Sequence, residues 1–252
     1  MEREIEIKKL KQNMRNYLYN IYAHQDCCET ETYNAVQDYY KLIMLTNGIN
    51  YEEYSMTLHL VSSLSDEIYA LMDQEEHDET RFNVYLRKDN FRVHNSAETS
   101  IAFFNLIDAG HEFHHIVQYI QEPDIVNDYD DRYSEIESSM LMIANQCKGE
   151  PKQFKHIDKI FDRYELEIML ISTMEKQADL KSYRFLINLL NEIVQNDEDI
   201  NFANFLYNCK FYITDDFKQR KRLLYESHKA HGITAEMLKK RFGIDESLIK
   251  LP

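Results

Sequence analysis

The chain is almost free of the two residue types that interrupt regular structure. Five glycines and three prolines occur in 252 residues. Most segments between them carry apolar residues at the 3.6-residue spacing of an amphipathic helix, so the sequence predicts a predominantly α-helical protein. The predicted helices cover about 2–23, 32–46, 51–75, 97–121, 132–147, 152–195 with a break near 162, 199–211, 214–230, 234–242 and 246–250.

One segment departs from the helical period. Residues 81–87 alternate polar and apolar side chains, residues 88–90 can form a turn, and residues 91–94 alternate again. The pattern predicts a β-hairpin, and the expected fold class is therefore α+β with a small hairpin or sheet. An extended peptide can bind by adding itself to an exposed strand edge, which makes Asn83 and Tyr85 candidate substrate-binding residues. The alternative is a hairpin that merely covers the core.

Residues 111–115 read His-Glu-Phe-His-His, within the helix predicted at 97–121. Positions i and i+4 of a helix share one face, so His111 and His115 can offer ring nitrogens to one metal ion. This is the H-E-x-x-H pattern of zinc hydrolases. Catalytic zinc takes three protein ligands and keeps one position for water. Glu112 is then placed as the general base that takes the proton of that water.

The third zinc ligand has two candidate positions. Glu175 lies in a long helical pattern, and Asp179, one turn later on the same face, can accept the free ring N–H of a zinc-binding histidine. Small Ala178 would let two helices approach closely. The alternative is Glu135 or Glu137, because Glu135 follows the motif at a spacing close to that of thermolysin-like enzymes. We prefer Glu175 because a second carboxylate accompanies it.

A peptidase also needs a group that stabilises the oxyanion, usually a Tyr, His or Arg. The chain has 18 tyrosines, so the sequence does not select one. Tyr183 lies two turns beyond Glu175, and His114 is adjacent to the expected ligands.

Charge and cysteine content exclude several classes of function. The net charge of −15 argues against non-specific binding to nucleic acid or to an anionic membrane, because both require clustered positive charge. The sequence predicts neither a signal peptide nor a membrane span, since it has no apolar N-terminal stretch and no run of 18 apolar residues. None of the four cysteines forms a Cys-x-x-Cys pair, so no structural zinc site is expected. These features predict a cytoplasmic protein.

Three stretches resemble small cytosolic gluzincin-type peptidases, and among them the ImmA/IrrE family of bacterial and phage metallopeptidases. They are residues 111–115, residues 175–179 and the tail at 235–245. The gap between the first two is longer than is usual in that family, so we expect a helical insertion at about 124–163. The expected regions are an N-terminal helical region at 1–78, a zincin-like core at 79–212 and a helical tail at 213–252.

The resemblance implies a role for each motif residue. His111, His115 and Glu175 would bind zinc, Glu112 would be the base, and Asp179 would orient a zinc ligand. It also implies regulatory proteolysis of a protein substrate, such as a transcriptional repressor, in a bacterial or mobile-element context.

Two rival hypotheses concern the whole chain. One is a catalytically inactive peptidase fold that acts as a protein-interaction or transcription-regulatory module. The other is a helical protein that uses His111 and His115 for a structural metal. A further alternative concerns the tail alone, because the basic residues 239–241 lie in a compact helix-turn-helix pattern that can bind DNA. Helix pairs of this kind are common packing elements, so we expect no DNA binding there.

Overall fold

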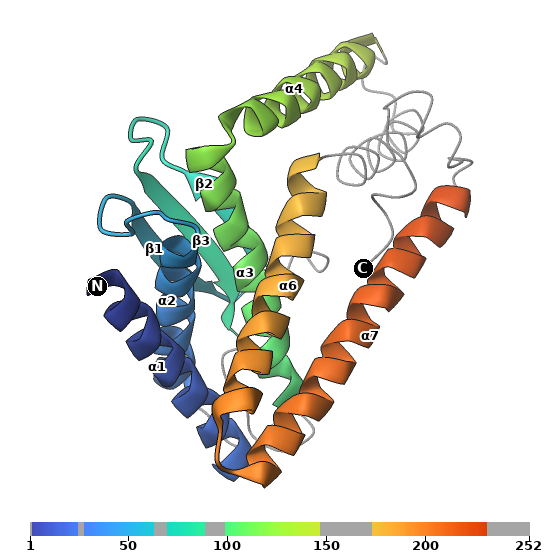
Figure 1. Ribbon diagram of the computed structural model, residues 1–252. Helices are drawn as coiled ribbons and strands as arrows, with labels where there is room; N and C mark the ends of the chain where they lie inside the picture. The colour runs from blue at the N-terminus through green and yellow to red at the C-terminus, as the bar shows by residue number, and fades with distance from the viewer. Residues whose placement is uncertain (1, 25–27, 63–69, 89–98, 147–172, 231–252) are drawn as a thin grey trace. The chain divides into compact units, whose positions relative to one another are not determined.

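The computed structural model describes residues 2–24, 28–62, 70–88, 99–146 and 173–230 (Figure 1). Within these ranges the protein is a mostly helical α+β fold with six helices and a three-stranded mixed sheet, which confirms the expected class. The elements are α1 (Glu2–His24), α2 (Glu29–Thr46), β1 (Ser55–Val61), β2 (Ala70–Gln74), β3 (Arg81–Arg87), α3 (Thr99–Gln121), α4 (Pro123–Gln146), α6 (Thr173–Asn196) and α7 (Ile200–Ala230).

The chain divides into two compact units. The first comprises residues 1–121 and 178–216, and the second comprises residues 122–177 and 217–252. The boundaries pass through α6 and α7, each of which is one continuous helix. The N-terminal helices α1 and α2 therefore share a unit with the sheet and α3.

The prediction of a helix at 51–75 was wrong, because this segment contains β1 and β2. Met56, Leu58 and Leu60 alternate with more polar residues in β1, which is the two-residue period of a strand. The sheet has the order β1-β3-β2. β3 pairs in parallel with β1, from Ser55 opposite Arg81, and antiparallel with β2, from Ala70 opposite Leu86.

The hairpin prediction was wrong in its pairing. β3 is a strand as expected, but its partners are β1 and β2, and residues 91–94 lie outside the described residues. Because β3 is the central strand, both of its backbone edges are occupied and no peptide can be added there. The side chain of Asn83 accepts a hydrogen bond from Nε2 of His59 (3.0 Å), and Tyr85 stacks on the same imidazole with centroids 4.7 Å apart.

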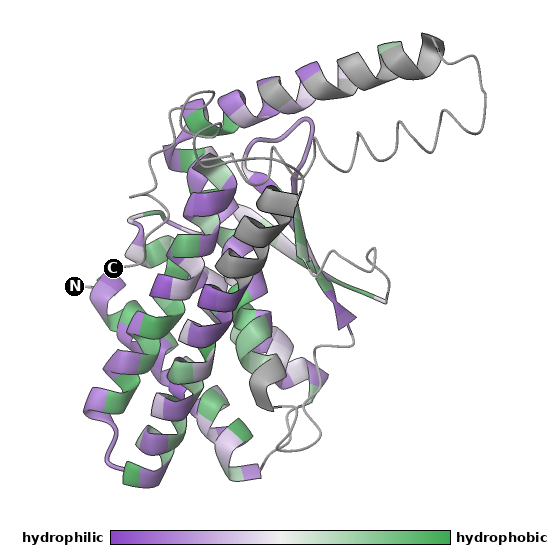
Figure 2. Cartoon of the chain, turned by 90° about the vertical axis from the view of Figure 1, so that its right-hand side faces the viewer, coloured by the Kyte–Doolittle hydropathy of each residue, from purple (hydrophilic) through white to green (hydrophobic). Residues whose placement is uncertain are grey.

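The core of the first unit forms around α3. This helix packs against α2, β2 and β3, and α2 also packs against α1. From Ala102 to Gln118 most residues of α3 are buried, as expected for a helix surrounded by other elements. Many helical turns outside the grey segments carry both hydrophobic and hydrophilic residues, which is an amphipathic pattern (Figure 2). The two-histidine motif is thus carried by the most enclosed helix of its unit.

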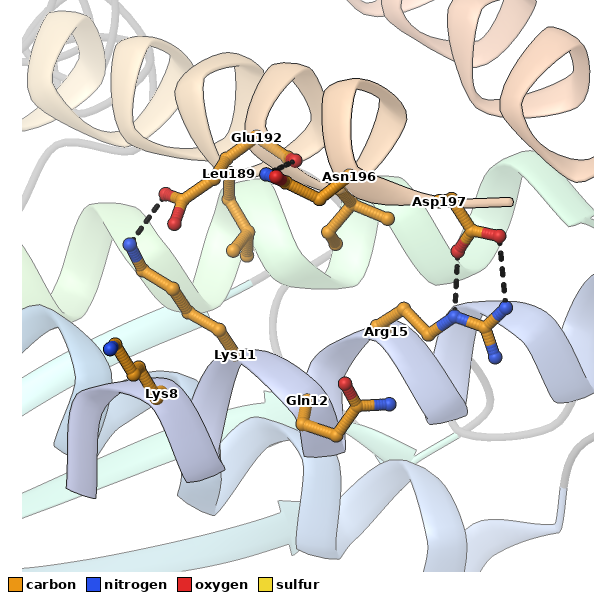
Figure 3. A pocket seen from close by; sticks show the side chains of 9 residues that line it. Lys8, Lys11, Gln12, Arg15, Leu189, Glu192, Asn196 and Asp197 are labelled. Atoms are coloured by element: carbon orange, nitrogen blue, oxygen red, sulfur yellow. Dashed lines mark hydrogen bonds and ion pairs between the residues drawn. The ribbon is translucent and has the colours of Figure 1, made fainter. Parts of the chain in front are cut away.

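Paired charges join α1 to the second half of α6 and to Asp197, the residue that follows the end of α6 (Figure 3). The guanidinium of Arg15 donates two hydrogen bonds to the carboxylate of Asp197, over 2.7 and 3.1 Å, and Lys11 pairs with Glu192. A pocket of about 310 Å³ lies along this contact. We interpret it as a gap between packed helices, because these two cations on its wall already face carboxylates.

Candidate metal centre

Two helices supply the residues of the H-E-x-x-H motif and its partners. His111, Glu112 and His115 lie on α3, and Glu175 and Asp179 lie on α6. Glu175 is in the first turn of α6, where the helix dipole favours a negative charge. Since α6 is continuous, Glu175 and Asp179 are one turn apart on the same helix face.

The imidazoles of His111 and His115 converge. Their Nε2 atoms are 2.9 Å apart, and the rings meet edge to face at an interplanar angle of 84°. Together with a carboxylate oxygen of Glu175, the ligand atoms lie within 4.8 Å of one another. His111, His115 and Glu175 therefore form a group that could hold a metal ion, as the sequence predicted.

Asp179 fixes the ring of His111. Nδ1 of His111 donates a hydrogen bond to Oδ1 of Asp179 over 2.8 Å. A carboxylate only accepts, so the ring proton must be on Nδ1, and Nε2 keeps its lone pair for a metal. The contact that the sequence predicted between Asp179 and a motif histidine is present.

The hydrogen-bond partner of His115 is a residue that the motifs did not predict. Nδ1 of His115 lies 2.9 Å from the side-chain oxygen of Gln118, and the side chain of Gln118 is fully buried. Gln118 follows His115 by three positions on the same helix face, which is the signal that could have identified it.

The two contacts have an electrostatic consequence. The Nε2 atoms of the two rings lie 2.9 Å apart, and the carboxylate of Glu175 adds negative charge nearby. Such an arrangement favours a shared cation. Two imidazole nitrogens and one carboxylate oxygen are a ligand set typical of catalytic zinc, so the residues fit this metal.

A close approach of α3 and α6 at Gly110 and Ser182 accompanies the contact between His111 and Asp179. The hydroxyl of Ser182 donates to the carbonyl oxygen of Ile107 over 2.7 Å. A Cβ atom on Gly110 would lie 2.6 Å from Oγ of Ser182 and 3.2 Å from Cε1 of Tyr39. Gly110 therefore permits a helix approach that a larger residue would obstruct. Ala178, expected to allow such an approach, is fully buried.

The remaining motif residues are also enclosed. Glu112 is buried, with 8% of its surface exposed. Nδ1 of His114 donates to the carbonyl oxygen of Gly110 over 2.6 Å, and burial lowers the pKa of His114 to about 4. His114 is therefore a neutral core residue.

The hydroxyl of Tyr183 donates a hydrogen bond to the carboxylate of Asp216 over 2.6 Å. The hydroxyl proton of Tyr183 is therefore engaged with Asp216.

The alternative third ligands have different outcomes. Glu135 is exposed on α4 and is not part of the metal-capable group found among the described residues. Glu137 lies on the same helix, but its side chain is outside the described part of the structure. The predicted helix-turn-helix at 234–250 is also outside the described residues.

Comparisons of the chain with models of protein families, with curated proteins and with solved structures found no match. The resemblance to ImmA/IrrE peptidases therefore rests on the motifs.

Among the helices of the described residues, none has the length and apolar character needed to span a bilayer.

Proposed function

We propose that this protein is a zinc-dependent peptidase that hydrolyses a protein or peptide substrate. Its ligands are His111, His115 and Glu175, and its general base is Glu112. The observation that carries the proposal is the convergence of two imidazole Nε2 atoms and one carboxylate within 4.8 Å. When bound, zinc supplies Lewis acidity, which polarises a carbonyl and makes water more acidic.

Glu112 performs the proton transfers. It follows His111 directly on α3 and is buried, so its carboxylate is shielded from competing water. In the proposed reaction Glu112 takes a proton from the attacking water as the new C–O bond forms. It then delivers that proton to the nitrogen of the leaving amine as the C–N bond breaks.

The sheet offers a place for an extended substrate. β1 and β2 are the outer strands of the described sheet, and α3, which carries the motif, packs against β2. A peptide paired with the outer edge of β2 would run beside the motif helix. Asn83 and Tyr85 alternate along β3 with the buried Phe82, Val84 and Leu86, and Phe82 faces Tyr119 of α3. The side chains of Asn83 and Tyr85 therefore lie on the other face of the sheet, and we assign them no part in this binding mode. Regulatory cleavage of a repressor is the biological context that the motif resemblance suggests.

Substitution Glu112→Gln tests the proposal. The purified variant should retain zinc but lose hydrolysis of an unfolded substrate such as casein by about 10²- to 10⁴-fold, because an amide cannot accept the proton. Glu135→Gln, which changes an exposed glutamate, is the matched control and should behave as wild type. If Glu112→Gln hydrolyses at the wild-type rate, the proposed base is wrong. Zinc binding without hydrolysis of casein or a mixed peptide library by wild type would instead favour the non-enzymatic module.

A further inference from the structure

Gln118 contacts His115, one of the candidate metal ligands, although it is not part of the H-E-x-x-H motif. It is three residues beyond His115 on α3, and its side-chain oxygen lies 2.9 Å from Nδ1 of His115. Its side chain is fully buried, and His115 has 4% of its surface exposed. Bulk solvent therefore has little access to this ring nitrogen.

We propose that Gln118 is a positioning residue, which acts on the metal through His115. An amide oxygen accepts a hydrogen bond, so it requires the proton of His115 to be on Nδ1. This tautomer leaves the lone pair of Nε2 directed at the group formed with His111 and Glu175. The other tautomer would place a proton on Nε2, where it blocks metal binding.

The two histidines are oriented in different ways. His111 is held by a carboxylate, Asp179, whose side chain is 48% exposed. His115 is held by a neutral amide with no exposed surface. A neutral acceptor avoids the desolvation cost that a second carboxylate would incur at a fully buried position. The tautomer of His115, the more buried of the two histidines, is therefore fixed without another buried charge.

If Gln118 has only a structural role, the effects of substituting it should be opposite to those expected for a positioning role. If Gln118 only fills space, Met, which has a similar shape and no charge, should replace it well, and Glu should be damaging. If Gln118 is needed as an acceptor, Gln118→Glu keeps the acceptor oxygen and should preserve zinc binding, although it lowers the free energy of unfolding because it buries a charge, whereas Gln118→Met removes the acceptor. Loss of such an outer-shell acceptor typically weakens metal affinity about 10- to 100-fold.

The experiment measures the zinc affinity of the full chain by competition with a chromogenic chelator. We expect Gln118→Met to weaken zinc binding about 10- to 100-fold, and Gln118→Glu to stay within about 3-fold of wild type. Asn105→Leu is the matched control, because it removes another buried amide from α3 and should leave zinc affinity unchanged. Equal affinities for wild type and Gln118→Met would overturn the inference.

A second measurement uses only the wild-type protein, so it does not depend on whether a variant folds. Correlation of ring ¹⁵N with carbon-bound ¹H in metal-free wild type reports which nitrogen of His115 carries the proton. We expect a proton on Nδ1, and a His115 ring protonated on Nε2 alone would overturn the inference. The inference rests on the proposed zinc site, but the two fail separately. Absence of zinc binding by wild type would reject the site, whereas a wild-type affinity that Gln118→Met does not change would reject the role of Gln118 alone.

Discussion

The hydroxyl of Ser182 donates a hydrogen bond to the carbonyl oxygen of Ile107 over 2.7 Å, one turn before the motif histidines begin. This bond joins α6 to α3 at the point where Gly110 leaves room for it. One turn earlier on α6, Asp179 contacts His111. The geometry of the candidate metal centre therefore depends on how closely these two helices pack.

Gly110→Ala should disturb that packing. The new methyl group would lie 2.6 Å from Oγ of Ser182, so Ser182 must rotate and release Ile107, and Tyr39 must also shift. We expect a loss of about 1–3 kcal/mol in the free energy of unfolding, measured by urea titration, together with weaker zinc binding. The higher helix propensity of alanine offsets part of that loss.

Combining Gly110→Ala with Ser182→Ala tests the cause. The double variant removes the atom in conflict, so its loss should be smaller than the sum of the two single losses. Additive losses would show that the obstruction lies elsewhere.

Tyr39→Phe should not destabilise the protein. The Tyr39 ring is fully buried between Phe113 and Phe185, and its hydroxyl has no hydrogen-bond partner in the described structure. Removing an unsatisfied buried hydroxyl should raise the free energy of unfolding by about 1 kcal/mol.

The neighbouring Tyr40 provides the matched comparison, because its hydroxyl donates to the carbonyl oxygen of Tyr54 over 3.1 Å. Tyr40→Phe should lower the free energy of unfolding by about 1 kcal/mol. Chemical denaturation of the two variants should thus give shifts of opposite sign. A clear loss in Tyr39→Phe would mean that its hydroxyl has a stabilising role.

The contact between Arg15 and Asp197 should make stability depend on pH. Hydrogen bonding to Arg15 lowers the pKa of the Asp197 carboxyl. A carboxyl group whose pKa is lower in the folded state stabilises the protein at pH values above its pKa in the unfolded chain, which is about 3.9 for Asp. This contribution is lost as the pH falls through the pKa of the folded state. Asp197→Asn should therefore lower the free energy of unfolding by about 1–2 kcal/mol at pH 7. The difference in this free energy between the variant and wild type should become smaller below about pH 4.

Denaturant titrations between pH 7 and pH 3 measure this difference. Glu198→Gln, which removes the adjacent exposed carboxylate, is the control and should have little effect at any pH in this range. A difference between wild type and Asp197→Asn that stays constant with pH would contradict the assigned role of the ion pair.

Local sequence patterns predicted most of the helices and the motif residues. The scarcity of glycine and proline indicated the helices. His111 and His115 are one helical turn apart, as are Glu175 and Asp179, so each pair could be recognised from the helical period. The strand β1 was missed because its alternating residues lie in a longer segment whose apolar residues also fit helical spacing. Its pairing with β3 is a contact between separate segments, which periodicity does not report.

The parts of the site that were missed depend on tertiary packing. Gln118 looks like an ordinary polar residue of a helix face until its burial beside His115 is known. Gly110 looks like a weak point in a helix until Ser182 is seen against it. Both residues act through contacts with the enclosed core rather than through a spacing in the sequence.

Zinc stoichiometry tests the central claim most directly. Protein freed of metal by chelation, reloaded with zinc and desalted should contain one zinc ion per chain by plasma mass spectrometry, and Glu112→Gln and Glu135→Ala should match it. His111→Ala and Glu175→Ala should each lose most of the bound zinc, because each removes one of three ligands. Full zinc occupancy in both of these ligand variants, or no zinc in the folded wild type, would contradict the metal centre on which the proposed peptidase depends.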